Sequence, residues 1–241
     1  MKIHYLNRDG VPRAEAQIHG EIERHFSKYH FSKNWVGYAS FSLLENGGAT
    51  DYDLLLFTHQ HIISIELKNW HGRKLESSGG LWFLDRANRG GSPVVRTQNN
   101  VKKLAGYLRR RLGNIVPYIG ACVVLHGSID EVHLSEDERP YVWTKEKLFK
   151  LVDPEFYRKH FYNGRPTLAR EYSKYHALFG KTDLVGKSYV VAGYRRDEIS
   201  FFEHPKGLYK EFFGAKEKNF RALIRSWDFS RFDEFQLIEN R

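Results

Sequence analysis

The segment 51–70, DYDLLLFTHQHIISIELKNW, constrains the fold more than any other part of the sequence. It contains two largely apolar runs, 54–57 and 62–65, which the polar residues 58–61 separate, with a turn at His59-Gln60. Two short runs of large apolar residues on either side of a turn are typical of neighbouring strands in a buried sheet. We therefore expect strands at 51–57 and 61–67. The charged residues at the outer ends of this hairpin need a separate explanation.

The flanking segments predict an α/β chain. Apolar residues at helical spacing indicate a helix over 12–26, and looser alternation indicates a strand over 35–45. We expect a loop rich in Gly, Ser and Arg over 71–92, and a helix over 94–112. The continuous apolar run 121–127 is typical of a central strand. This order of elements predicts a mixed central sheet flanked by helices.

The character of the sequence changes after residue 152, where Tyr, His, Arg and Lys become frequent. We interpret 187–193 and 199–202 as the strands of one hairpin, and 207–225 as a helix. We therefore divide the chain into a first domain over 1–152 and a C-terminal α+β extension or small accessory domain over 153–241.

Composition favours a protein of the cytoplasm without a membrane segment. The 41% hydrophobic content supports a core, whereas the longest apolar runs are far too short to span a bilayer, and the N-terminus has no signal-peptide pattern. The single cysteine, Cys122, lies in an apolar run, so neither a disulfide framework nor a cysteine zinc site is expected. The net charge of +9 favours a polyanionic partner, although solubility alone also explains it.

Two carboxylates and a lysine are expected at one edge of the hairpin. Alternation along a strand places Glu66 and Lys68 on the same side, and Asp53 reaches this edge from the adjoining strand. Carboxylates bind hard divalent cations, and a neighbouring lysine positions or activates water. A structural salt bridge at a strand end is the alternative interpretation of Glu66 and Lys68.

The pattern D-x-D, apolar strand, turn, apolar strand, E-L-K-N-W resembles the nuclease-related domain family, NERD, a branch of the PD-(D/E)xK nuclease superfamily. The resemblance covers roughly 12–152. It implies a restriction-endonuclease-like core that hydrolyses phosphodiester bonds in DNA with Mg²⁺ or Mn²⁺.

The resemblance also implies roles for individual residues. Asp53 and Glu66 match the metal-binding carboxylates of the motif, and Lys68 matches its lysine. Asp51 falls where the family often has another acidic residue, and the Leu67 carbonyl is a further expected metal ligand.

Two more side chains are expected at the site. Glu15 lies on the same face as the apolar residues of the first helix and is expected to point inward, whereas Glu21 is displaced from that face and is expected in solvent. NERD proteins commonly have a Glu in this helix, so the resemblance implies that Glu15 is a candidate third carboxylate. A favourable interaction of Glu15 with the helix dipole is the alternative. The family often has a glutamine three residues after Pro93, where this chain has Arg96. On the helical wheel Gln98 lies nearer the apolar stripe, so we expect Gln98 at the site and Arg96 on the opposite side.

Several basic side chains could hold phosphates, since such contacts dominate nucleic-acid affinity and carry no sequence information. A solvated helix face is an equally good interpretation. The candidates are Arg73, Lys102, Lys103, Arg109 and Arg110, with Arg86, Arg89 and Arg111 nearby. His59, His61 and His71 lie in or near turns and are expected to be exposed rather than metal ligands. The aromatic residues Tyr172, Tyr175, Tyr189 and Tyr194 are expected to fill a core rather than to stack on bases.

The last residues, from Arg225 to Arg241, resemble the linker that follows NERD modules in proteins with a serine/threonine kinase domain. This resemblance implies a longer bacterial polypeptide, of the phage-defence type, with a downstream kinase domain or another partner protein. Two functions are thus expected: a metal-dependent nuclease acting on DNA or RNA, or a non-catalytic DNA-binding or regulatory module. The sequence does not specify the oligomeric state.

Overall fold

The structure is a computed structural model, and it describes residues 1–5, 11–45, 48–113 and 116–161 together with short strands between 184 and 239. The chain divides into two units. The first comprises Met1–His4, Arg13–Ala39 and Tyr52–Tyr175, and the second comprises Tyr5–Pro12, Ser40–Asp51 and His176–Arg241.

The main sheet is mixed, as expected, with the strand order β1-β2-β3-β4-β8-β10. β3 and β4 pair antiparallel, whereas β4 pairs parallel with β8, and β8 pairs parallel with β10. The predicted hairpin and the predicted central strand are therefore confirmed. The bounds are β1 Lys2–Tyr5, β2 Val36–Glu45, β3 Gly48–Phe57, β4 Ile62–Lys68, β8 Ile119–Leu125 and β10 Val142–Thr144.

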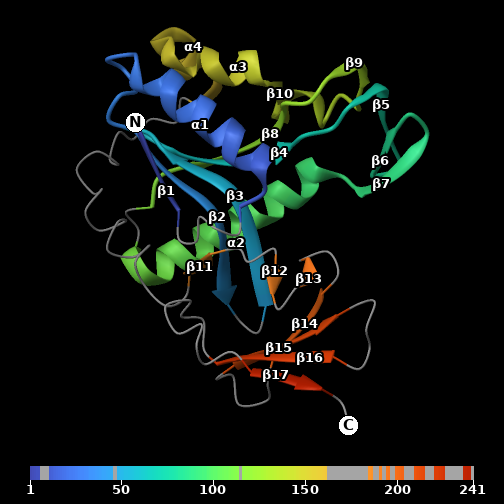
Figure 1. Ribbon diagram of the computed structural model, residues 1–241. Helices are drawn as coiled ribbons and strands as arrows, with labels where there is room; N and C mark the ends of the chain where they lie inside the picture. Colours follow the sequence, from blue (N-terminus) through green and yellow to red (C-terminus); the bar gives the residue numbers. More distant parts are fainter. Residues whose placement is uncertain are drawn as a thin grey trace. The chain divides into compact units, whose positions relative to one another are not determined.

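Two long helices accompany this sheet, both where the sequence predicts them. α1 (Arg13–Ser27) buries Ile18, Ile22 and Phe26. α2 (Pro93–Leu112) begins at the Ser92 N-cap and packs against β4 and β8. In Figure 1, α1 lies above β4 and β8 and α2 crosses below them. No helix in the described part of the chain is long and apolar enough to cross a membrane.

Four shorter helical segments follow β8 in the described part of the chain, and the first is the 3-10 helix η2 (Arg139–Tyr141). α3 (Lys145–Phe149) packs against β8, β10 and α1, and the one-turn 3-10 helix η3 (Lys150–Val152) continues it. α4 (Pro154–Phe161) lies in the first unit, although the sequence assigned it to the extension after residue 152. The functional boundary between a nuclease domain and an extension stays a prediction.

The prediction of a loop over 71–92 is wrong, because this segment forms most of a second, four-stranded sheet. Its order is β7-β6-β5-β9, with β5 Gly72–Ser78, β6 Leu81–Leu84, β7 Ala87–Gly91 and β9 Ile129–His133. Two-residue turns join the first three strands, at Gly79–Gly80 and Asp85–Arg86, and all four residues have positive φ. Such turns match the twist of a hairpin and favour Gly and Asp.

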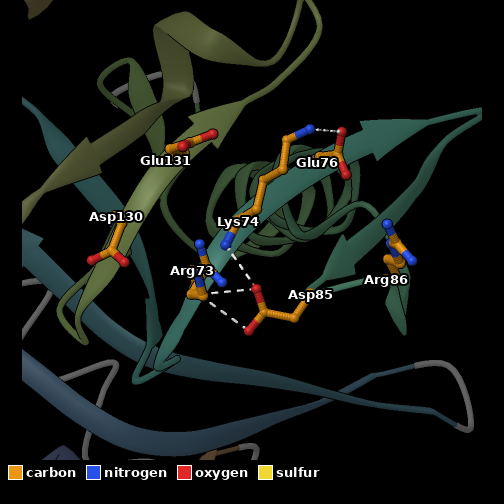
Figure 2. A pocket seen from close by; sticks show the side chains of 7 residues that line it. All are labelled: Arg73, Lys74, Glu76, Asp85, Arg86, Asp130 and Glu131. Carbon is orange, nitrogen blue, oxygen red and sulfur yellow. Dashed lines mark hydrogen bonds and ion pairs between the residues drawn. The ribbon is translucent and has the colours of Figure 1, made fainter.

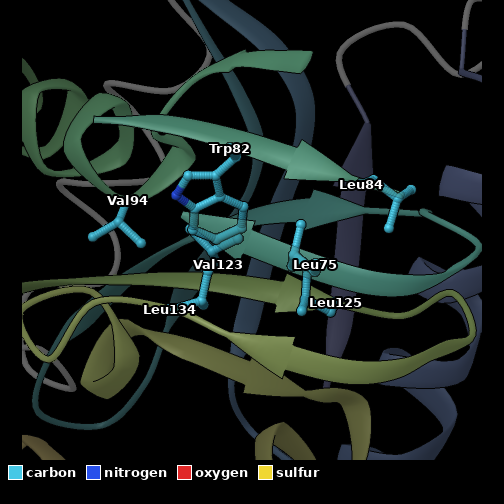
Figure 3. Packing of buried hydrophobic residues seen from close by; sticks show 7 residues of the cluster. All are labelled: Leu75, Trp82, Leu84, Val94, Val123, Leu125 and Leu134. Atoms are coloured by element: carbon cyan, nitrogen blue, oxygen red, sulfur yellow. The ribbon is translucent and has the colours of Figure 1, made fainter. Parts of the chain in front are cut away.

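A buried cluster joins this small sheet to the main sheet. Trp82 and Leu84 of β6 and Leu75 of β5 pack against Val123 and Leu125 of β8 (Figure 3). Val94 from the first turn of α2 completes the contact, with Leu134. The N-terminal end of α2, the end of β8 and the small sheet therefore form one packed region.

His61 is buried, which contradicts the expectation that it is an exposed turn residue. Only 3% of it is accessible, because Tyr157 of α4 covers it and its Nδ1 lies 2.8 Å from the Tyr157 hydroxyl. The same hydroxyl lies 2.6 Å from Thr58 Oγ1, whose own proton goes to the His61 carbonyl. Burial, together with the neighbouring His59, lowers the pKa of His61 to about 4. This network connects α4 to the β3–β4 turn.

The C-terminal segments are strands where they are described. β12 Val190–Val191 pairs with β13 Tyr194–Arg195, and β14 Ile199–Glu203 pairs with β15 Tyr209–Gly214. The predicted pairing of 187–193 with 199–202 is therefore wrong. The predicted helix over 207–225 is also wrong, because β15 and β16 (Phe220–Arg225) form an antiparallel pair. Aromatic and branched residues in both segments favour strands.

Two more strands complete the second unit: β11 Leu184–Gly186, which pairs antiparallel with β2, and β17 Gln236–Glu239, which pairs with β16. Tyr172, Tyr175 and Tyr189 lie outside the described residues, as does most of the expected linker. Only the backbone of Tyr194 is described.

Candidate functional site

Asp53 and Glu66 meet where the pairing of β3 with β4 ends. The register places Leu54 opposite Ile65, so the next pair along the two strands is Asp53 and Glu66, with side chains on the same face. Asp53 Oδ2 accepts a hydrogen bond from the Leu67 amide at 2.8 Å. The Asp53 side chain thus replaces a main-chain carbonyl of β3 as the acceptor for this amide of β4, which holds the Asp53 carboxylate next to Glu66.

Lys68 lies beside Glu66 as the alternation of a strand requires. Its Nζ is 2.6 Å from Glu66 Oε1, and the two side chains are only 15% and 12% exposed. The Trp70 ring lies 6.0 Å from the Lys68 ammonium and packs edge-on against Trp82. The Lys68 side chain is therefore enclosed between a carboxylate and an indole ring.

Arg96 also reaches this site, so the prediction that it lies on the opposite side is wrong. Its Nη2 is 2.7 Å from Glu66 Oε1, the same oxygen that Lys68 contacts. A helical wheel describes where a side chain starts and not how far it extends, and an arginine in the first turn of α2 can reach around the end of β4. The sequence signal for Arg96 was its place three residues after Pro93.

Glu15 and Glu21 are two of the acidic side chains of α1. Glu21 acts on His126, next to the site, whereas the place of Glu15 at the site stays a prediction. Glu15 is half-buried in the first turn of the helix. Glu21 was expected in solvent, but its side chain is 25% exposed and its Oε2 is 3.0 Å from Lys145 Nζ. This hydrogen bond with Lys145 is the leading cause that lowers the pKa of Glu21.

His126, which follows β8 directly, is a neighbour that the sequence reasoning missed. Its amide donates to the Lys68 carbonyl at 3.0 Å, so its position is fixed relative to β4. Burial lowers the pKa of His126, and the carboxylates of Glu21 and Asp53 oppose that shift. The feature of the sequence that could have indicated His126 is the His-Gly pair at the end of the apolar run 121–127.

Three predicted site residues are placed without a tested role. Gln98 is half-buried on α2, and its contact with the site stays a prediction. The buried Leu67 donates its amide to Asp53, and the role of its carbonyl as a metal ligand also stays a prediction. Asp51 accepts a hydrogen bond from Ser42, and both residues belong to the second unit.

Comparison with protein families gives one result for this region. Residues 13–126 match the family model of the nuclease-related domain, NERD. The chain carries a NERD domain. The matched region contains Asp53, Glu66, Lys68 and Arg96, and the mixed α/β sheet agrees with a nuclease-like fold. Comparison with curated proteins and with solved structures found no match.

The donor set of the NERD domain fits a hard divalent cation. Asp53 and Glu66 supply carboxylate oxygens from adjacent strands, and Mg²⁺ usually takes one or two carboxylates and completes its coordination with water and substrate phosphate. No group of three or more His, Cys, Asp or Glu side chains placed to hold a metal occurs among the residues that the structure describes. The fit therefore concerns a site with two protein carboxylates.

The basic side chains predicted to contact phosphate are exposed. Arg73 lies on β5 of the NERD domain, and the others lie along α2: Lys102, Lys103, Arg109 and Arg110. Arg86 and Arg89 of the small sheet are exposed too. Exposure is compatible with a role in binding nucleic acid and does not test it.

Arg73 also lines a hollow of about 610 Å³ on the small sheet (Figure 2). Seven charged side chains line it: Arg73, Lys74, Arg86, Glu76, Asp85, Asp130 and Glu131. Asp85 accepts hydrogen bonds from the amides of Arg73 and Lys74, and Lys74 is 2.8 Å from Glu76. Because acids outnumber bases in this hollow, its charge does not favour a phosphate inside it.

Proposed function

We propose that the chain is a metal-dependent nuclease that hydrolyses phosphodiester bonds in DNA. The observation that carries the proposal is the juxtaposition of Asp53, Glu66 and Lys68 at the end of the β3–β4 pairing, within the segment that matches the NERD family. RNA is the alternative substrate of the same chemistry. A role in bacterial phage defence, in the cytoplasm, is the biological setting that the proposal favours.

Asp53 and Glu66, with the Leu67 carbonyl, would hold Mg²⁺ or Mn²⁺, and Glu15 and Asp51 would assist. Such an ion polarises a phosphoryl oxygen and lowers the pKa of a bound water. Asp53 is oriented for this task by its hydrogen bond from the Leu67 amide. Rigid strands hold the two carboxylates in a fixed relation, which a precise site requires.

Lys68 would stabilise negative charge on the reacting phosphate or orient the attacking water. Its ammonium lies 2.6 Å from Glu66, one of the two carboxylates proposed to hold the metal. Gln98 would support the site from α2. The exposed Arg73, Lys102, Lys103, Arg109 and Arg110 would contact the phosphates of the DNA on either side of the cleaved bond.

A non-catalytic DNA-binding or regulatory module is the second candidate, and one observation favours it. Both Lys68 and Arg96 already neutralise Glu66, which is how a purely structural carboxylate is stabilised. A module of this kind would bind DNA without a metal and leave it intact. A downstream kinase domain or another partner protein would then supply the activity.

A cleavage assay separates the two candidates. Supercoiled plasmid and labelled single strands are incubated with the purified chain in Mg²⁺, Mn²⁺ or EDTA, beside Glu66→Ala and Lys68→Ala variants shown to be folded by circular dichroism. The nuclease proposal expects metal-dependent nicking that falls by about 100-fold or more in each variant. DNA binding without cleavage under any metal, unchanged in both variants, would favour the binding module.

A further inference from the structure

Arg96 is a charged side chain at the candidate site that the proposed mechanism leaves without a role. It lies in the first turn of α2, and its Nη2 is 2.7 Å from Glu66 Oε1. Lys68 Nζ contacts the same oxygen at 2.6 Å. The single negative charge of Glu66 is therefore paired with two positive charges, one more than neutralisation requires.

The two cations are held very differently. The Lys68 side chain is 15% exposed and Glu66 is 12% exposed, whereas the Arg96 side chain is 56% exposed. Lys68 and Glu66 stand two residues apart on one rigid strand, and Arg96 comes from another element through a long side chain. An ion pair with one exposed, flexible partner is weak, so Arg96 can leave Glu66 at small cost.

A divalent metal at Asp53 and Glu66 would compete with Arg96 for Glu66. A carboxylate that accepts a metal ion attracts a nearby guanidinium less, because the metal neutralises it and repels the cation. The released guanidinium would have a planar set of donors at a site where a phosphate must bind, and Arg binds phosphate oxygens in a bidentate manner.

We propose that Arg96 exchanges between Glu66 in the metal-free protein and a substrate phosphate in the metal-bound protein. The proposal rests on the proposed metal site at Asp53 and Glu66. Arg96 is thus an internal counter-ion: it pairs with Glu66 in the metal-free protein and binds a phosphate once the metal is bound. It couples the two binding events: metal frees Arg96 for DNA, and DNA withdraws Arg96 from Glu66. Such coupling is reciprocal by thermodynamic necessity.

The first test measures Mn²⁺ affinity by isothermal titration calorimetry on the full chain, at constant ionic strength. Arg96→Gln removes the competing cation and should tighten Mn²⁺ binding about fivefold, the scale expected for loss of a partly exposed ion pair. Arg158→Gln removes the same charge from an exposed position on α4 and should leave the affinity unchanged. Arg96→Lys retains a cation and should restore weaker binding.

The second test measures affinity for a short DNA duplex with cleavage-resistant linkages, in Mn²⁺ and in EDTA. The proposal expects Mn²⁺ to strengthen DNA binding of the wild type about threefold more than it strengthens binding of Arg96→Gln. Arg158→Gln should show the wild-type gain. A merely structural role of Arg96 would lower affinity equally with and without metal.

The outcomes distinguish this inference from the proposed function. If Glu66→Gln weakens Mn²⁺ binding but Arg96→Gln binds Mn²⁺ as the wild type does, the metal site stands and the exchange of Arg96 is refuted. If neither the wild type nor Arg96→Gln binds Mn²⁺, or if Glu66→Gln binds it unchanged, the metal site itself fails and the exchange fails with it. Tight Mn²⁺ binding that appears only in Arg96→Gln would support the exchange.

Discussion

Glu138 provides the most stringent test of how the site is supported. This carboxylate is 8% exposed, and it joins the small sheet to the start of α2. Its Oε1 accepts hydrogen bonds from Trp82 Nε1 at 2.8 Å and from the Ser92 hydroxyl, and its Oε2 accepts from Ser135 at 3.0 Å. Burial raises the pKa of Glu138, but hydrogen bonds from Ser92, Trp82, Ser77 and Ser135 outweigh it, so the pKa is lowered.

Glu138→Ala should lower the free energy of unfolding by about 3–4 kcal/mol. A buried donor left without an acceptor costs about 1–3 kcal/mol, and Trp82 Nε1 becomes such a donor. Lost bonds to a charged acceptor add to this cost, although Ser92 keeps its contact with the Val95 amide. Glu138→Gln retains one acceptor oxygen and should cost about 1–2 kcal/mol.

Urea unfolding at neutral pH measures these values, with Glu136→Ala as the matched control. Glu136 is an exposed acid two residues away, and its removal should change stability by at most about 0.5 kcal/mol. Because the folded-state pKa of Glu138 is lowered, its stabilisation is present above the unfolded pKa near 4.5 and is lost as pH falls below that value. A loss below about 1 kcal/mol at neutral pH, or one that is the same at pH 3, would refute the reasoning.

Two further predictions concern the elements that frame the site. The folded protein binds a proton at His61 more weakly than the unfolded chain does, because burial and His59 lower its pKa from 6.5 to about 4. The stability that this shift contributes is therefore fully present above pH 6.5. The free energy of unfolding, measured with urea, should fall by about 2 kcal/mol between pH 7 and pH 5, and an equal fall in His61→Gln would contradict this. Gly127→Ala would place a Cβ 1.9 Å from the Trp70 carbonyl and should destabilise the fold by more than about 2 kcal/mol. Gly106 lies inside α2, and a Cβ added there would be 3.5 Å from its nearest neighbouring atom, so Gly106→Ala should instead raise the thermal midpoint. Equal effects of the two substitutions would argue against the close approach of Gly127 to Trp70.

The sequence predicts the elements whose signals are local. The hairpin at 51–67 follows from two apolar runs and a turn, and its register then brings Asp53 opposite Glu66. α2 follows from its apolar stripe and from Pro93 at its first turn. In each case the residues that determine the element are neighbours along the chain, so periodicity is sufficient to identify it.

The features that sequence reasoning missed depend on contacts between distant segments. His61 is buried because Tyr157, 96 residues away, covers it. Arg96 reaches Glu66 through the length of its side chain, which a helical wheel ignores. Three of the four strands of the small sheet, β5, β7 and β9, have few apolar residues, and the sheet becomes recognisable only when Leu75 and Trp82 pack against the end of β8. The periodicity of apolar residues along the sequence cannot reveal these tertiary contacts.

The proposed nuclease activity requires that Asp53 and Glu66 share one divalent metal ion. The direct measurement is anomalous diffraction at the manganese edge from crystals of the chain soaked in Mn²⁺, with Glu66→Gln crystals as the control. A shared metal ion should give one strong peak between the two carboxylates in the wild type, with Arg96 displaced from Glu66, and the peak should be lost in the variant. Absence of the peak from a wild-type site open to solvent in the crystal, or an equal peak in Glu66→Gln, would contradict it.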